Sequence, residues 1–238
     1  MTERALSNLR VVEAAEGVAG PFCAKLFADL GADVIKVEPP NGDPSRTVGP
    51  FPGDQPHTER SGQFLYNNTG KRSVILDLDE EAHRDRLRGL TEEADLLITD
   101  LSPARLESLD LGYERLATGN DQLIMACISP FGQCGPYRHY QGSELIAWHA
   151  GGMGFESPHN QVTDPANEPP LKAGGYQAGY LSGWTAAAAT MASTRMRVLP
   201  VVGIMWRAKA GKPISQISSR SRMPPSTTSP AMPFRCAA

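Results

Sequence analysis

The chain has 238 residues and a formal net charge of −3 at neutral pH, so it is long enough for one large or two modest domains. A net charge this small gives no electrostatic reason to expect binding to nucleic acid or to an anionic membrane. No apolar run approaches the roughly 20 residues of a membrane span, and the N-terminus lacks the apolar segment of a signal peptide. We therefore expect a cytoplasmic protein.

The four cysteines show neither the pattern of a disulfide framework nor the spacing of metal ligands. Cys23 falls on the apolar face of a predicted helix, and Cys127 falls within a predicted buried strand. Both are expected to be packed thiols, and no metal site is predicted.

The N-terminal part of the chain predicts one β-α-β unit. Runs rich in β-branched residues at Leu9–Glu13 and Asp33–Glu38 predict two strands. Between them, apolar residues recur at helical spacing over 21–30. Pro21 suits the first helical position, and Gly31 suits a left-handed residue after the helix. Because two strands joined by one helix run parallel, the chain opens an α/β domain.

The turn after the first strand, Glu16–Gly20, is the first candidate ligand site, because ligands bind at the carboxyl ends of strands in open α/β sheets. The turn lacks a G-x-G-x-x-G pattern, so an oxidoreductase that uses a nicotinamide dinucleotide is poorly supported. The next segment, from Pro39 to Thr58, is rich in Pro, Gly and Asp. It is expected to be an irregular loop over the strand ends.

Strands and helices continue to alternate up to Ser129, as a doubly wound parallel sheet requires. Phe64–Arg72 is predicted to be a turn-bearing segment, and Glu80–Glu93 a charged surface helix. The remaining predicted elements are strands at Ser73–Leu78, Leu96–Thr99 and Leu123–Ile128 and short helices at Pro103–Leu109 and Tyr113–Ala117.

After Ser129 the sequence becomes rich in turns. Glu144–Ala150 is predicted to be a helix that two glycines end, and Met153–Gly174 is predicted to be a polar loop. Tyr180–Ala192 is rich in small residues and is predicted to be a helix that packs closely against another helix.

Several sequence blocks follow one another in order within residues 1–193. They are Ala19-Gly20-Pro21 with Leu30–Glu38, then Gly42–Arg46, Asn68–Leu78, Leu109–Glu114 and Ile128–Tyr137. Together these blocks resemble the class III CoA-transferases, the family that includes formyl-CoA and carnitine CoA-transferases. The resemblance implies a Rossmann-like large domain, transfer of CoA between an acyl-CoA and a small carboxylic acid, and homodimers of two interlocked chains.

The resemblance also implies that coenzyme A is a substrate and that no cofactor is tightly bound. Coenzyme A needs a crevice at strand ends, backbone N–H groups for its phosphates and apolar walls for its adenine. Leu76 and Leu78 could equally be core residues without a ligand contact. The predicted CoA-binding residues follow or end predicted parallel strands, and they are Val18, Ala19, Leu76, Asp77, Leu78, Asp100, Leu101 and Ser102.

By the same resemblance, catalysis runs through an aspartate that attacks the acyl-CoA carbonyl and forms a mixed anhydride. Alignment on Lys172-Ala173-Gly174 and on Gly183 places Gly179 where that aspartate belongs. Glycine has no nucleophile, so no catalytic residue is predicted and the isolated chain is expected to be inactive. The racemase branch of the family uses a His–Asp pair, and here Ser143 and Gly179 occupy those positions.

Some acidic residues could replace the missing aspartate, and they are Glu144, Glu156, Asp164 and Glu168. Each of them is expected to be a solvated helix or loop carboxylate instead. His149 is expected to be packed within a helix, and none of the five histidines shows a nucleophile–base arrangement. The segment Asp100–Ala104 also departs from the Asn-Phe-Arg-Pro-Gly pattern of the family.

The end of the chain has a different composition. Residues 194–238 hold eight basic residues and no acidic one, whereas all 26 acidic residues lie before Thr194. One explanation is a disordered basic tail. We favour translation in a shifted reading frame after about Ser193, which re-reading the DNA in the other two frames would test. Residues 1–193 would then be the N-terminal part of the large domain, lacking its last strand and crossover and exposing apolar surface.

Three functions remain open. The chain is a CoA-transferase, or a CoA-binding half whose partner supplies the aspartate in a longer or heteromeric enzyme, or a truncated product without function. Binding of coenzyme A separates the second possibility from the third. The interlocked homodimer of the family is not expected for so short a chain.

Overall fold

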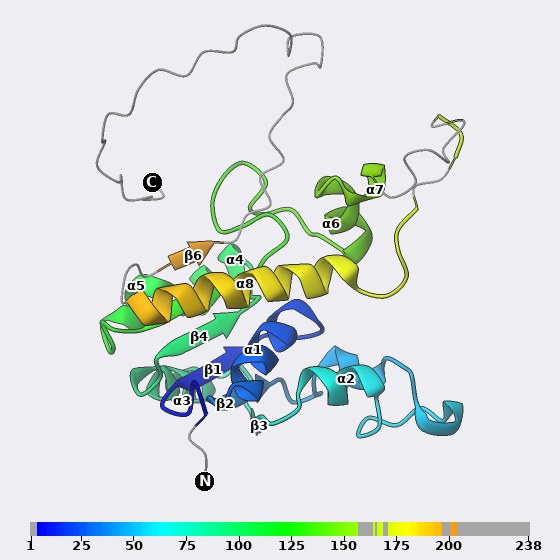
Figure 1. The fold of residues 1–238 in the computed structure, drawn as a ribbon. Helices are drawn as coiled ribbons and strands as arrows, with labels where there is room; N and C mark the ends of the chain where they lie inside the picture. The colour runs from blue at the N-terminus through cyan, green and yellow to red at the C-terminus, as the bar shows by residue number, and fades with distance from the viewer. Residues whose placement is uncertain (1–3, 157–163, 165, 169–170, 197–200, 204–238) are drawn as a thin grey trace, which may run out of the picture. The chain divides into compact units, whose positions relative to one another are not determined.

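The computed structural model describes residues 4–156, 164, 166–168, 171–196 and 201–203. The chain divides into two units, Met1–Trp206 and Arg207–Ala238, and every described residue lies in the first. One parallel sheet runs through this unit in the order β3-β2-β1-β4-β5-β6 (Figure 1). Its strands are β1 (Arg10–Ala14), β2 (Asp33–Glu38), β3 (Arg72–Ile75), β4 (Leu96–Thr99), β5 (Ile124–Cys127) and β6 (Val201–Gly203).

The strand order reverses at β1, which lies between β2 and β4. Val12 pairs in register with Ile35 on one side and with Leu97 on the other. In doubly wound sheets this switch point opens a crevice at the carboxyl ends of the strands. The predicted Rossmann-like α/β fold is confirmed, and the crevice is the place to look for a ligand.

The helices cover both faces of the sheet. Alternate strand residues turn to opposite faces, so Val11 packs with the helices α1 and α8, whereas Val12 packs with α3, α4 and α5 (Figure 1). The helices are α1 (Ala19–Asp29), α2 (Gly62–Asn67), α3 (Glu81–Glu92), α4 (Pro103–Ser108), α5 (Tyr113–Ala117), α6 (Glu144–Ala150), α7 (Met153–Glu156) and α8 (Gln177–Met196). The predicted packed thiols are confirmed, because Cys23 and Cys127 are both buried.

Four local predictions differ from the structure. The predicted polar loop Met153–Gly174 begins with helix α7. Phe64–Arg72 was expected to be a turn-bearing segment, but helix α2 occupies its first residues because the Ser61 hydroxyl caps the Phe64 N–H. The predicted loop Pro39–Thr58 contains two short 3-10 helices, η1 (Pro44–Thr47) and η2 (Pro52–Asp54). Pro21 lies two positions after Ala19, the first residue of α1, rather than at the helix start.

The C-terminal boundary proposed at residue 193 stays a prediction. Helix α8 runs on to Met196, and β6 pairs with β5 through Val201–Gly203. Residues 204–238 lie outside the described part of the chain. Within the described part, no helix combines the length and the apolar character that crossing a membrane requires.

Small residues allow α8 to pack closely against α1, as the sequence predicted. A Cβ atom on Gly183 would lie 2.5 Å from the Ala19 carbonyl oxygen and 3.3 Å from the Cys23 backbone nitrogen. Ala186 and Ala187, one turn further, are fully buried in the core beside α1. The backbones of the two helices therefore touch where α1 begins.

This contact makes Gly183→Ala destabilising. We expect the extra methyl group to lower the free energy of unfolding by about 1–3 kcal/mol, because its nearest neighbour, the Ala19 carbonyl oxygen, is a backbone atom that cannot move aside easily. Gly89→Ala is the matched control, since Gly89 lies within α3 with open space around it. That control should stabilise by about 0.5–1 kcal/mol through helix propensity. Chemical denaturation measures both, and equal stability of the two variants would contradict the close packing.

Candidate functional site

A pocket of about 260 Å³ lies at the carboxyl ends of β1, β2, β3 and β4. Residues that follow each of these strands line it, so four separate chain segments meet at the switch point of the sheet. They are Ala14–Glu16, Val37 and Pro39, Leu76–Asp79, and Asp100, Leu101 and Arg105. We call this pocket the strand-end pocket.

The strand-end pocket brings together five of the eight predicted CoA-binding residues. These five are Leu76, Asp77, Leu78, Asp100 and Leu101. Leu76 is only 1% exposed and belongs to the hydrophobic core. It therefore has the core role that the sequence analysis considered for it as an alternative.

The other three predicted residues do not line the strand-end pocket. Val18 precedes the first residue of α1, and the Ala19 carbonyl oxygen faces Gly183. The Ser102 hydroxyl caps α4 by accepting the Arg105 N–H. These residues adjoin the pocket through the chain, because Val18 follows Glu16 in the same turn and Ser102 follows Leu101.

Arg105 is a residue of the strand-end pocket that the sequence analysis missed. Its guanidinium donates to Asp79 at 2.7 Å, and its side chain stays 40% exposed. The sequence contained a weak signal, because Arg105 lies only two positions after Pro103, the first residue of the predicted helix, and so lies close to the end of the preceding strand. Arginine is the side chain best suited to bind phosphate groups.

Carboxylates surround the rest of the strand-end pocket. Asp100 accepts the Glu16 backbone N–H at 2.9 Å. Burial raises the pKa of Asp100 to about 7, and the Glu16 carboxylate contributes, although the Glu16 N–H and Lys36 oppose the shift. Burial, together with Asp43, also raises the pKa of Glu16. The carboxylate of Asp100 is thus held in a form that is partly protonated near neutral pH.

Below the turn that follows β1 lies a cluster of buried charges: Glu13, Lys36, Asp43 and Lys71. Lys36 Nζ contacts Glu13 at 2.9 Å and Asp43 at 2.8 Å, and Lys71 Nζ contacts Glu13 at 2.6 Å. Burial disfavours the charged form of Lys36, but Glu13 and Asp43 outweigh it and raise the pKa of Lys36. Burial lowers the pKa of Lys71 to about 8, and Glu13 limits that shift.

This charged cluster holds the turn in place. Lys36 Nζ donates to the Ala15 carbonyl at 2.8 Å, and Lys71 Nζ donates to the Pro21 carbonyl at 2.8 Å. Asp43 accepts the Gly17 N–H at 3.1 Å. Lys36 and Asp43 therefore fix the start and the middle of the turn, and Lys71 holds the first turn of α1, which follows it.

Gly179 lies in the first turn of α8, and its backbone N–H donates to a carboxylate. Glu144 accepts the Ala178 N–H at 2.7 Å through Oε1 and the Gly179 N–H at 3.0 Å through Oε2. The prediction that Glu144 is a solvated carboxylate is therefore wrong: it caps the N-terminus of α8, whose first N–H groups have no partner within the helix. A Cβ on Gly179 would lie 3.1 Å from Val18 Cγ1 and 3.6 Å from Glu144 Oε2.

The other candidate carboxylates are those of Glu156, Asp164 and Glu168, and Glu168 accepts the Asp164 backbone N–H at 3.0 Å. Glu156 and Asp164 are exposed, and Asp164 accepts the side-chain amide of Asn167. Ser143 caps α6, and the His149 ring packs within 2.1 Å of where a Cβ on Gly154 would be. No group of metal-ligating side chains occurs among the described residues.

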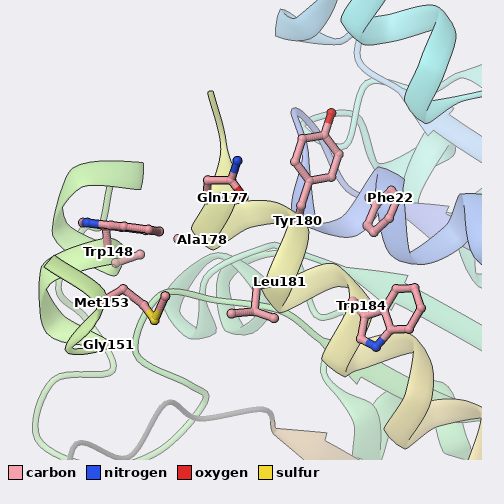
Figure 2. A pocket seen from close by; sticks show the side chains of 10 residues that line it. Phe22, Trp148, Gly151, Met153, Gln177, Ala178, Tyr180, Leu181 and Trp184 are labelled. Atoms are coloured by element: carbon pink, nitrogen blue, oxygen red, sulfur yellow. The ribbon is translucent and has the colours of Figure 1, made fainter. Parts of the chain in front are cut away.

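A second pocket, of about 360 Å³, opens on the other side of Gly179. Ala178 and Tyr180 line it, and both flank Gly179 in the chain. Figure 2 shows side chains of α8 facing those of α6 and α7 across this space. Its larger lining residues are Phe22, Trp148, Met153, Tyr180, Leu181 and Trp184. We call it the aromatic pocket.

A family model described as CoA-transferase family III matches residues 6–198. This match covers most of the chain and includes both pockets and Gly179. The chain therefore belongs to CoA-transferase family III, and the resemblance read from its sequence blocks is confirmed.

Named relatives share this fold over part of their length. The chain is 44% identical over 166 residues to the succinyl-CoA:(R)-benzylsuccinate CoA-transferase subunit BbsE of Thauera aromatica, covering 66% of this chain and 40% of BbsE. A CAIB/BAIF family protein from Brucella suis matches with a TM-score of 0.70 and 35% identity, over 82% of this chain and 50% of that one. Rv3272 from Mycobacterium tuberculosis matches with a TM-score of 0.74 and 31% identity, over 85% and 55%. The chain thus spans about half, or less, of the length of these relatives.

The raised pKa of Asp100 predicts a dependence of stability on pH. The pKa of Asp100 is about 7 in the folded protein and 3.8 ordinarily. The folded state is therefore most favoured over the unfolded state below pH 3.8, and this advantage is lost as pH rises through 7. Asp100→Asn does not titrate and keeps an oxygen that can accept the Glu16 N–H. We expect it to be more stable than the unmodified chain at pH 8, by about 2 kcal/mol.

The gain should shrink as pH falls from 8 to 5, and thermal unfolding across that range measures it. Asp121→Asn, at an exposed position, is the matched control. A pH-independent difference for Asp100→Asn would contradict the raised pKa.

The cap on α8 predicts a second effect. Glu144→Ala leaves two backbone N–H groups without their acceptor, so we expect the free energy of unfolding to fall by about 1–2 kcal/mol. Glu144→Gln keeps one amide oxygen and should lose less. Glu107→Ala, an exposed glutamate on α4, is the control and should change stability by less than about 0.5 kcal/mol. If Glu144→Ala unfolds like Glu107→Ala, the cap does not contribute.

Proposed function

We propose that this chain binds coenzyme A or an acyl-CoA at the strand-end pocket but supplies no acyl-accepting carboxylate of its own. The aspartate would come from another chain, or from a further part of a longer protein. The whole assembly would transfer CoA between an acyl-CoA and a small carboxylic acid. Nucleic acid and membranes are not part of this proposal, and a cytoplasmic location fits it.

The chemistry of the strand-end pocket supports one end of coenzyme A as its ligand. Its volume, about 260 Å³, is below the roughly 300–1,000 Å³ of sites for whole drug-sized molecules. Leu76, Leu78 and Leu101 offer apolar walls to a neutral adenine. The carboxylates of Glu16 and Asp100 disfavour a phosphate inside the pocket, so the phosphates would lie toward Arg105 at its edge.

The turn after β1 gives the thiol arm a path toward Gly179. Ala15 and Glu16 line the strand-end pocket, and Val18 in the same turn lies against Gly179. The predicted contacts at Val18 and Ala19 would then serve the arm rather than the adenine. A thioester at the end of that arm would reach the place where the resemblance requires an attacking carboxylate.

One observation carries the proposal: Gly179 offers no side chain, and the nearest carboxylate, Glu144, is bound to backbone N–H groups through both oxygens. Hydrogen bonds to both oxygens stabilise the carboxylate and weaken it as a nucleophile. The name of BbsE, a CoA-transferase subunit, agrees with a role beside a second chain.

The test uses the full chain of 238 residues. Calorimetric titration should detect binding of coenzyme A, and Arg105→Ala should weaken it about 5- to 20-fold through loss of a phosphate contact. Arg115→Ala is the control, because Arg115 pairs with Asp110 on α5, outside the strand-end pocket. Incubation with succinyl-CoA should give no acyl-enzyme or enzyme thioester by intact-mass spectrometry.

Adding a family chain that carries the aspartate should then yield the enzyme thioester on that added chain. An acyl adduct on the isolated protein would contradict the missing nucleophile. Failure to bind coenzyme A would contradict the binding role. A truncated product without function would then be the remaining explanation.

A further inference from the structure

An ion pair lies at the solvent-exposed edge of the strand-end pocket. Arg105 Nη2 donates to Asp79 Oδ1 at 2.7 Å, and both residues line the pocket. Asp79 follows β3, and Arg105 lies on α4, which follows β4. Both side chains remain open to solvent, Asp79 at 72% exposure and Arg105 at 40%. A ligand that extends from the pocket to solvent can therefore reach both charged groups.

The two partners of this ion pair differ in how far they can move. The Asp79 backbone is held on both sides, because its N–H donates to Asp77 Oδ1 at 3.0 Å and its carbonyl accepts Arg84 Nη1 at 2.9 Å. Aspartate also has a short side chain, whereas arginine has a long one that ends in a guanidinium with five N–H donors. Arg105 can therefore turn to a new acceptor, while the Asp79 carboxylate stays nearby.

A phosphate group of a ligand would take the place of Asp79 at Arg105. A solvent-exposed ion pair contributes little to stability, so its replacement costs little. Phosphate oxygens can accept two parallel hydrogen bonds from a guanidinium, and a phosphate monoester carries more negative charge than a carboxylate. The Asp79 carboxylate would then lie beside the bound phosphate and repel it. Asp79 therefore opposes a phosphate at the position where Arg105 favours one.

The two faces of the sheet indicate which phosphate of coenzyme A reaches Arg105. The turn after β1 leads into α1, which covers one face of the sheet with Val11 (Figure 1). Leu101, which precedes α4, packs with the core on the opposite face. The thiol arm and its pyrophosphate start from the 5′ carbon of the ribose and would follow the turn toward Gly179. The 3′-phosphate leaves the ribose from another carbon and would lie on the α4 side, beside Arg105.

We propose that Asp79 sets the affinity of the strand-end pocket for the 3′-phosphate of coenzyme A: Arg105 binds this phosphate, and Asp79 weakens the binding. This inference rests on the proposed function, because it concerns the same ligand at the same pocket. It adds a specificity-determining residue and assigns one of the three phosphates to Arg105. Two residues of opposite effect would thus determine how the chain distinguishes coenzyme A from dephospho-coenzyme A, which lacks the 3′-phosphate.

Calorimetric titration of the full chain with coenzyme A and, separately, with dephospho-coenzyme A tests the inference. Asp79→Asn removes the charge and keeps the shape of the side chain, so we expect it to tighten binding of coenzyme A about 3- to 10-fold at about 20 mM salt. Arg105→Ala should weaken coenzyme A about 5- to 20-fold. Both variants should leave the affinity for dephospho-coenzyme A within about twofold, because this ligand lacks the phosphate that meets them.

Asp85→Asn is the matched control. Asp85 accepts Arg88 Nη1 at 2.7 Å on α3, outside the strand-end pocket, so this variant removes the same charge from an ion pair of the same length. It should leave the affinity for both ligands within about twofold. Raising the salt concentration to about 500 mM should remove most of the gain from Asp79→Asn, because salt screens exposed charges.

Three outcomes would overturn the inference. If the unmodified chain and Asp79→Asn bind coenzyme A equally well, Asp79 does not oppose the phosphate, and the proposed function still stands. If Asp79→Asn tightens both ligands equally, the effect belongs to the total charge of the ligand and not to its 3′-phosphate. If neither ligand binds to any of these chains, the proposed function fails together with this inference.

Discussion

Four buried charges beneath one turn fix the relation between the strand-end pocket and Gly179. Lys36 and Lys71 each bind a backbone carbonyl of the turn region and a buried carboxylate. Removing such charges from water costs several kcal/mol per ion unless each is paired. Movement of the turn would break the hydrogen bonds that Lys36 and Asp43 make with its backbone, and a buried polar group without a partner costs about 1–3 kcal/mol. Its two ends, Glu16 at the strand-end pocket and Val18 at Gly179, keep a constant spacing for that reason.

The first turn of α8 keeps an anion even though residue 179 has no side chain. Helix N-termini stabilise negative charge through free N–H groups and the helix dipole. Glu144, on α6, accepts the N–H groups of Ala178 and Gly179 and places its negative charge at this helix N-terminus. The carboxylate at this helix start therefore comes from α6 and is bound to the backbone through both of its oxygens.

The sheet could be predicted from the sequence because its strands are short runs rich in β-branched and apolar residues, a signal that depends on local residues alone. The strand ends then brought Leu76, Asp77 and Asp100 to one pocket, since parallel strands end at the same edge. The Glu144 cap could not be predicted in this way, because it joins residues 34 and 35 positions apart across a loop. The helix α2 was missed because its six residues are too few for a helical period to appear.

Helix α8 explains why an apolar pocket opens next to Gly179. Its small residues face α1, and Gly183 lets the two backbones approach more closely than any side chain would permit. With that face fixed, the helical repeat turns Leu181 toward Met153 of α7, whereas Tyr180 lies against Phe22 of α1 (Figure 2). Since α6 is tied to the start of α8 by the Glu144 cap, the opposite wall is fixed as well. The pocket therefore depends on two contacts, a glycine and a glutamate, of which neither lines it.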